Sequence, residues 1–200
     1  MGDSKAAYRE LESLSDKHPL DMVYKTMLGN WLMQHDRQKE AYKLFTDVLK
    51  EEPDNAYAES SLYDYYNATG QKEQARLMLD RILLGKNTDL ETKIVMIRSF
   101  IQENERNGGD STEVLNLFTK ILDVPKPSGE LAELRAAYMG LKKMPQDSVD
   151  AAFQKVLTIA PDHASARMQL VQSLWNQKKY DEVIDMTNQA QAYNPDEMVF

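Results

Sequence analysis

Residues 22–55 read MVYKTMLGNWLMQHDRQKEAYKLFTDVLKEEPDN and form one complete unit of a repeat that recurs along the chain. Neighbouring units are marked at an interval of 34 residues, and only the step from Asn87 to Pro127 is longer, by six. A fixed period of this length, with a helix-stopping residue closing each unit, predicts a solenoid of helix pairs. The markers are Pro19, Pro53, Asn87, Pro127, Pro161 and Pro195.

The second half of each unit carries the apolar face of a predicted helix. In 22–55 this face is Ala41, Phe45 and Val48, and offsets of four and three residues place them on one side of an α-helix. Pro53 follows and prevents the helix from continuing. The same columns contain Ala7, Leu11, Leu14, Ala75, Leu79, Ile82, Val114, Phe118, Ile121, Val149, Phe153, Val156, Val183, Thr187 and Ala190.

The first half of each unit predicts another helix, which presents Leu28, Gly29 and Leu32 in 22–55. The small Gly29, and Ala137 at the equivalent place in a later unit, predict close approach of two helix backbones. Breaker residues such as Thr69-Gly70 separate the two helices of a unit. Most of the six extra residues fall in a predicted loop insertion at 103–110. No stretch alternates as a strand would, so the chain is predicted to be all-α.

These residues resemble the tetratricopeptide repeat (TPR) family, and the best match in this chain is Leu28-Gly29, Leu32, Ala41, Phe45 and Pro53. The resemblance covers a half repeat at 5–19 and repeats at 22–55, 56–89, 90–129, 130–163 and 164–197. It implies one right-handed superhelical solenoid of antiparallel helix pairs over residues 1–200, with about 11 helices. The chain departs from the family at the early tryptophan, which is replaced by Lys25, Glu59, Lys93, Glu133 and Arg167.

The two ends of the sequence lack the separate polar caps that solenoids need. We therefore expect a segment of a longer repeat protein. The alternatives are a complete small protein whose last helix, at 180–193, is itself the cap, and a homodimer that pairs through the uncapped ends.

The composition excludes several classes of function. The net charge of −8 does not fit a nucleic-acid partner, which needs a concentrated basic surface. No segment has the ~20 apolar residues of a membrane span, and the start does not resemble a signal peptide. The absence of cysteine removes thiol chemistry and leaves the compartment open, with a lean toward an oxidising or cell-envelope location.

Catalytic and metal-binding patterns are also missing from the sequence. There is no glycine-rich phosphate loop, and the acidic pairs lie on predicted polar faces or turns. His18, His35 and His163 lie at predicted corners and lack the i, i+4 pairing that a helical metal site needs. We expect no enzymatic activity, no cofactor and no metal.

The family resemblance implies a concave groove lined by the second, fifth, ninth and twelfth positions of the first helices. Aromatic side chains and arginine at such positions suit a peptide or a partner helix. The chaperone-tail clamp of some family members is absent, since Thr26 replaces a lysine and Glu91 and Val95 replace basic residues. The candidate groove residues are Asn30, Met33, Tyr57, Asp64, Arg98, Tyr138, Gln172 and Trp175.

Two functions therefore stand as predictions. The first is a non-catalytic protein–protein interaction scaffold that binds a peptide or a partner helix in the groove. The second is a structural spacer of a longer repeat protein that self-associates through its solenoid ends.

Overall fold

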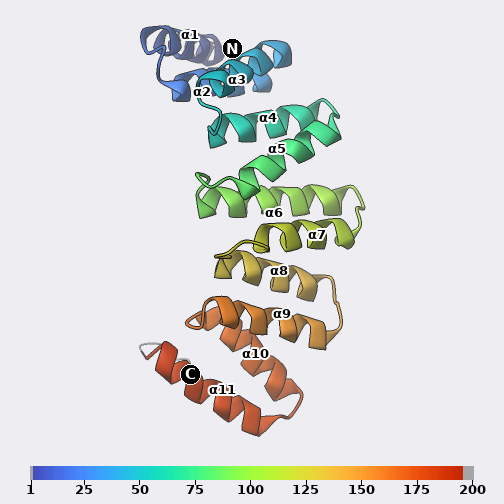
Figure 1. Ribbon diagram of the computed structural model, residues 1–200. Helices are drawn as coiled ribbons and strands as arrows, with labels where there is room; N and C mark the ends of the chain where they lie inside the picture. The colour runs from blue at the N-terminus through green and yellow to red at the C-terminus, as the bar shows by residue number, and fades with distance from the viewer. Residues whose placement is uncertain (1, 196–200) are drawn as a thin grey trace. The chain divides into compact units, whose positions relative to one another are not determined.

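The computed structural model describes the backbone of residues 2–195 and the side chains of residues 4–195 (Figure 1). Within this part of the chain the secondary structure consists of helices without strands, which confirms the all-α prediction. The helices are α1 (Gly2–Lys17), α2 (Met22–Gln34), α3 (Gln38–Glu51), α4 (Ala56–Ala68), α5 (Lys72–Leu84), α6 (Leu90–Arg106), α7 (Ser111–Leu122), α8 (Gly129–Leu141), α9 (Gln146–Ile159), α10 (Ala164–Asn176) and α11 (Tyr180–Tyr193).

The chain divides into two compact units, Met1–Phe100 and Ile101–Phe200, and α6 runs across the division. In unit 1, α2 packs against α1, α3 and α4, and α4 packs against α5. In unit 2, α8 packs against α7 and α9, and α10 packs against α9 and α11. Each unit is thus built from consecutive helices that pack on their neighbours in the sequence.

Short connections separate the two helices of each pair. Each connection contains a residue with positive φ, which reverses the chain after a helix. Two are glycines in the predicted breakers, and the other three are Asp36, Lys143 and Lys178. Side-chain caps begin several first helices: the Asp21 carboxylate accepts from the Val23 amide, and the Asn55 side chain accepts from the Ala58 amide.

Half of the predicted insertion at 103–110 is helix and the other half is loop. Residues 103–106 belong to α6, which has 17 residues where α2 and α4 have 13. The end of the added turn is fixed by Asn104, whose carbonyl accepts from the Gly109 amide at 2.8 Å. Asn104 is buried, and a Cβ on Gly109 would lie 2.3 Å from its Nδ2, so any other residue at 109 would displace the Asn104 side chain.

The core of unit 1 is centred on Phe45 of α3. Its ring is fully buried against Leu28, Leu32 and Leu62. A Cβ on Gly29 would lie 2.3 Å from Phe45 Cε1, which confirms the close approach expected at this glycine. At the start of the unit, Leu11 of α1 is only half-buried. Ala7 is exposed, so the apolar face expected there extends less far than the pattern predicted.

The core of unit 2 surrounds Phe153 and Val156 of α9, which pack with Ala136, Met139 and Leu170. The close approach predicted at Ala137 is wrong, because Ala137 is exposed on α8, as is Gly140 one turn later. The small residues of α8 that face the core are instead Ala132 and Ala136, which are buried.

The position of the missing tryptophan holds a buried charge in both units. In unit 1, Glu59 accepts from Arg81 Nε at 2.8 Å, and Arg81 Nη2 donates to the Pro53 carbonyl at 2.7 Å. Burial is the main cause that raises the pKa of Glu59. In unit 2, Arg167 is itself at this position, with 2% of its surface exposed, and its Nη2 donates to the Pro161 carbonyl at 2.6 Å. Both repeats thus place a guanidinium on the carbonyl of the preceding marker proline.

Candidate binding surfaces on the first helices

The face of α2 that does not pack on other helices carries apolar side chains. Val23 is 52% exposed and Met27 is 48% exposed, and Asn30 and Gln34 continue the same face. The spacing of four, three and four residues is that of one helix face. Apolar side chains exposed in a row on a helix are candidates for contact with a partner.

The neighbouring helix α4 adds an aromatic residue to this face. Tyr57 occupies the same repeat position as Val23 and is 75% exposed. Asp64, at the position of Asn30, is also exposed. Because α2 and α4 pack together, these residues make one area, which we call the unit 1 surface: Val23, Met27, Asn30, Tyr57 and Asp64.

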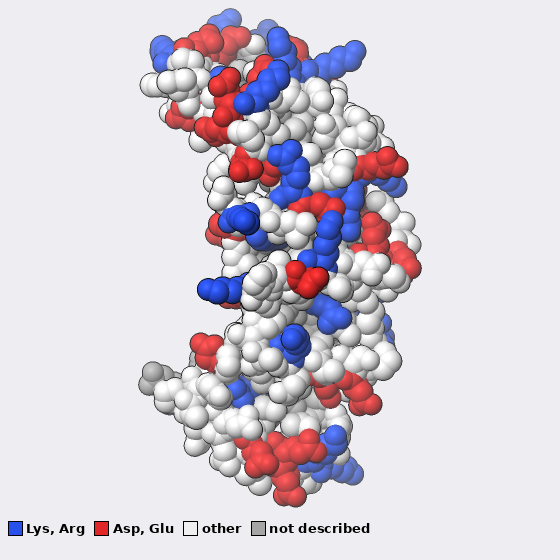
Figure 2. All heavy atoms as spheres, in the orientation of Figure 1, with Lys and Arg blue, Asp and Glu red and all other residues white. Residues whose placement is uncertain are grey.

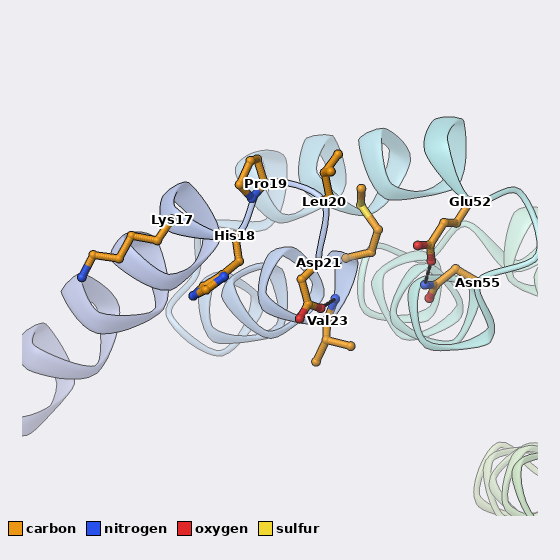
Figure 3. Close-up of a pocket in the computed structure, with 9 residues that line it drawn as sticks. Lys17, His18, Pro19, Leu20, Asp21, Val23, Glu52 and Asn55 are labelled. Carbon is orange, nitrogen blue, oxygen red and sulfur yellow. Dashed lines mark hydrogen bonds between the residues drawn. The ribbon is translucent and has the colours of Figure 1, made fainter.

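A cavity of about 570 Å³ lies beside the unit 1 surface, and Val23 belongs to both. Figure 3 shows Pro19 and Leu20 in the segment between α1 and α2, with Glu52 and Asn55 across from them. The side chain of Lys17 extends away from the other labelled residues (Figure 3). The cavity is lined by Lys17, His18, Pro19, Leu20, Asp21, Met22, Val23, Glu52 and Asn55.

Among the remaining predicted residues of unit 1, Arg98 on α6 is exposed. Met33 on α2 is half-buried and packs against the cluster around Phe45, so it serves the core as well as the surface.

In unit 2 the exposed residues of the first helices are more varied. Leu141 at the end of α8 is 72% exposed, and Trp175 at the end of α10 is 60% exposed. The Trp175 ring meets the ring of Tyr180 edge-on, with a centroid distance of 5.3 Å. Gln172 is exposed one turn before Trp175.

A second cavity, of about 370 Å³, lies between α8 and α10 and has α9 as its third wall. We call it the α8–α10 notch. Its α8 wall includes the exposed Ala137 and Gly140, whose small size leaves the space open. It is lined by Glu133, Ala136, Ala137, Gly140, Gln146, Val149, Asp150, Phe153 and Gln169.

Tyr138 differs from the exposure expected for a groove residue. Only 3% of its surface is exposed, and its hydroxyl donates to Glu105 Oε1 at 3.0 Å. Lys142 Nζ donates to the same carboxylate. Burial, helped by the bond to Glu105, raises the pKa of Tyr138 to about 12. Tyr138 therefore links α8 to the added turn of α6, and a ligand would not reach it without displacing neighbours.

The fifth position of the first helices is less exposed than the sequence indicated. Thr26 is buried, and its hydroxyl donates to the Met22 carbonyl at 2.8 Å. The sixth position is open at Met27, at Val95 and at Gln169. The sixth position was not among the predicted groove positions. It lies four residues after the second position of its repeat and three before the ninth, which is the spacing of one helix face.

A third cavity, of about 570 Å³, is lined by α5 and the segment that follows it, together with Asp54 and Glu59 near the start of α4. Its apolar residues Leu77 and Leu84 are exposed. This cavity is the main competing surface for a partner in unit 1.

Charges are spread over the surface in both signs. In the view of Figure 2, Lys and Arg side chains alternate with Asp and Glu side chains. The first half of α11 carries Asp181, Glu182 and Asp185. Within the described part of the chain, no three His, Cys, Asp or Glu side chains are grouped so that they would hold a metal ion. Nor does any described helix combine the length and apolarity that a membrane span requires.

Residues 32–92 match the family model described as tetratricopeptide repeat. This segment of the chain therefore carries tetratricopeptide repeat sequence. The matched segment contains α3 to α5, and with them Tyr57 and Asp64 of the unit 1 surface.

The whole chain is also similar to solved structures. One is the crystal structure of YrrB, "a TPR protein with an unusual peptide-binding site", at 14% identity, covering 94% of each chain with a TM-score of 0.46. Another is MamA AMB-1, at 15% identity, covering 90% of this chain and 96% of that one, with a TM-score of 0.46. A third is the APC/C hetero-tetramer Cut9–Hcn1, at 16% identity, covering 98% of this chain and 44% of that one, with a TM-score of 0.38. No curated protein sequence matches the chain.

Proposed function

We propose that this protein is a non-catalytic scaffold that binds a peptide or a helix of a partner protein on the exposed faces of its first helices. The observation that carries the proposal is the set of apolar and aromatic side chains on these faces. Tyr57, Trp175 and Leu141 are each at least 60% exposed. Large aromatic residues supply much contact area at a low cost in conformational entropy, and they are enriched among residues that dominate binding.

Two further features support a scaffold. The faces lie on helices held by buried cores, so their side chains are presented by a rigid framework. Polar residues such as Asn30, Asp64 and Gln172 lie next to the apolar ones and supply hydrogen-bonding groups for a peptide backbone.

A displayed library of random 12-residue peptides, selected on the full chain, tests this proposal. Affinities of the enriched peptides are then measured by titration calorimetry for the wild type, Tyr57→Ala and Trp175→Ala. For each peptide we expect one of the two variants to weaken binding by more than tenfold, as loss of an aromatic anchor does.

Leu77→Ala and Ile184→Ala are the matched controls, because each removes an exposed apolar side chain from a second helix. We expect both to bind as the wild type does. If Leu77→Ala loses peptide binding while both aromatic variants keep it, the peptide binds at the cavity beside α5 instead. A library that enriches no peptide would contradict the proposal.

The second candidate function, self-association, is supported by a different observation. The last described helix, α11, exposes Tyr180, Ile184 and Tyr193, each by more than half. Sedimentation equilibrium over a wide range of concentrations tests it: a mass that rises with concentration in the wild type and not in Ile184→Glu would support assembly through α11. A constant monomer mass would contradict it.

A further inference from the structure

We propose that the α8–α10 notch receives a lysine or arginine side chain of the bound partner. This inference rests on the proposed function and adds the chemistry of one contact to it. The notch has the size for one side chain, and it is lined by apolar residues and two carboxylates.

The notch has the size and walls for one long side chain. Its volume of about 370 Å³ is near the lower end of the roughly 300–1,000 Å³ range of small-molecule pockets. Ala136, Val149 and Phe153 give it apolar walls. The methylene stem of a lysine or arginine packs well on such walls while its charged end reaches polar groups.

The carboxylate of Asp150 in the notch is held by neutral donors. Its Oδ1 accepts from Gln146 Nε2 at 2.8 Å, and its Oδ2 accepts from Ser173 Oγ at 2.7 Å and from Gln177 Nε2 at 3.0 Å. These donors come from α9, α10 and the residue after α10, so they fix the orientation of the carboxylate without neutralising its charge. A carboxylate has about four acceptor positions, which leaves room for a further donor.

The second carboxylate, Glu133, is oriented in a similar way. Its Oε1 accepts from the Ser165 hydroxyl, and its Oε2 lies 3.6 Å from His163 Nε2, beyond an ordinary hydrogen bond. Both carboxylates are thus positioned in advance by their neighbours.

No lysine or arginine is among the residues that line the notch. An apolar side chain that filled it would remove water from two carboxylates without replacing the lost interactions, which is costly. An acidic side chain would be repelled. A cationic side chain gives both carboxylates a charged donor, and such hydrogen bonds are about twice as strong as neutral ones.

A metal ion is a poorer occupant. The described residues contain no group of three potential metal ligands, and a metal would meet only two carboxylates here. The chain also carries a net charge of −8, which favours the approach of a basic partner segment.

Peptides enriched from the random library on the full chain provide the test. The variant Gly140→Leu places a side chain over the notch. Peptides that bind the wild type but not this variant are expected to contain a lysine or an arginine. Gly140→Ala is the matched control. A Cβ at this position meets only Val149 Cγ1, at 3.8 Å, so Gly140→Ala is expected to fold. Circular dichroism checks that Gly140→Leu is folded as well.

Replacing that basic residue of the peptide by citrulline or norleucine should weaken binding to the wild type about tenfold, or about 1.4 kcal/mol. The same replacement should have little effect on the double variant Glu133→Gln, Asp150→Asn, which keeps the shape of the notch and removes its charge. Circular dichroism of the double variant checks that it is folded.

The outcomes separate this inference from the proposed function. Peptides that bind through Tyr57 or Trp175, contain no required basic residue and are unaffected by Gly140→Leu would overturn the inference and leave the scaffold standing. Failure to enrich any peptide would overturn both. Citrulline replacement could also weaken binding tenfold in the double variant, as it does in the wild type. That result would place the basic contact outside the notch and would overturn the inference as well.

Discussion

The helix pairs α2–α3 and α8–α9 place a phenylalanine at the same position of the repeat, but the space in front of the two rings differs. Gly29 lies against the ring of Phe45, and the contact is too tight for any side chain. In α8–α9 the equivalent ring, Phe153, lines the α8–α10 notch beside the exposed Ala137 and Gly140. The repeat pattern thus determines the packing of the helix pairs. The residues of the first helix determine whether the space in front of the phenylalanine ring is filled or open.

The largest expected effect is the loss of the phenylalanine in the filled pair. Phe45→Ala should lower the free energy of unfolding by about 3–5 kcal/mol, because the ring is fully buried. Phe153→Ala should cost less, since its ring already borders an open cavity. Hydrogen exchange of the amides in α2–α4 and α8–α10 measures the two losses separately. An equal or larger loss for Phe153→Ala would break the comparison.

The next largest difference in stability is expected at the buried charges that replace the early tryptophan of the family. Arg167→Lys should destabilise unit 2 by about 2 kcal/mol, because lysine cannot both reach the Pro161 carbonyl and stack on Tyr193, whose ring centroid lies 5.3 Å from the guanidinium carbon. Arg81→Lys should cost less than about 1 kcal/mol, since the Arg81 side chain is 47% exposed. Denaturation by urea compares the two variants, and the reverse order would show that burial is not the deciding factor.

Alanine at the two glycines should act in opposite directions. Gly29→Ala should destabilise unit 1 by about 1–3 kcal/mol, because its Cβ would overlap the Phe45 ring. Gly140→Ala should stabilise unit 2 by about 0.5 kcal/mol, because the added Cβ makes only an ordinary contact and alanine favours helix. Thermal unfolding of the two variants checks the signs. A destabilised Gly140→Ala would mean that the notch is filled in solution.

The smallest expected effect concerns pH. The pKa of Glu59 is raised in the folded state, chiefly by burial, so the folded chain binds this proton more tightly than the unfolded chain does. The contribution of Glu59 to stability is therefore most favourable at low pH and declines as the pH rises above about 4.5, its ordinary pKa. Glu59→Gln should remove this decline. Urea denaturation of the wild type and of Glu59→Gln at about pH 4 and about pH 7 measures this decline. If the wild type gains stability relative to Glu59→Gln as the pH rises, the ion pair with Arg81 outweighs burial.

The framework was predictable because spacing alone determines which helix face is apolar. Phe45, Phe118 and Phe153 occupy one column of the repeat and are all buried, as the offsets of four and three residues predicted. The left-handed corners at Gly70 and Gly108 were equally visible, since glycine tolerates positive φ.

The exposed faces were less predictable because they depend on how each helix is rotated by its neighbours. A rotation of one residue moves exposure from Thr26 to Met27, and the repeat period carries no information about it. Tyr138 is buried because the added turn of α6 brings Glu105 within reach of its hydroxyl, and a sequence pattern does not show such a contact. The notch depends on the absence of side-chain volume at Ala137 and Gly140, which the sequence pattern suggested would be a packing contact.

Hydrogen exchange of the full chain with and without an enriched peptide tests whether a partner binds to the first helices. Because it reads all helices at once, it needs no prior choice of residue. The account predicts that the peptide slows exchange along α2 and α4, or along α8 and α10. Slower exchange confined to α5 or α11, with the first helices unchanged, would contradict it.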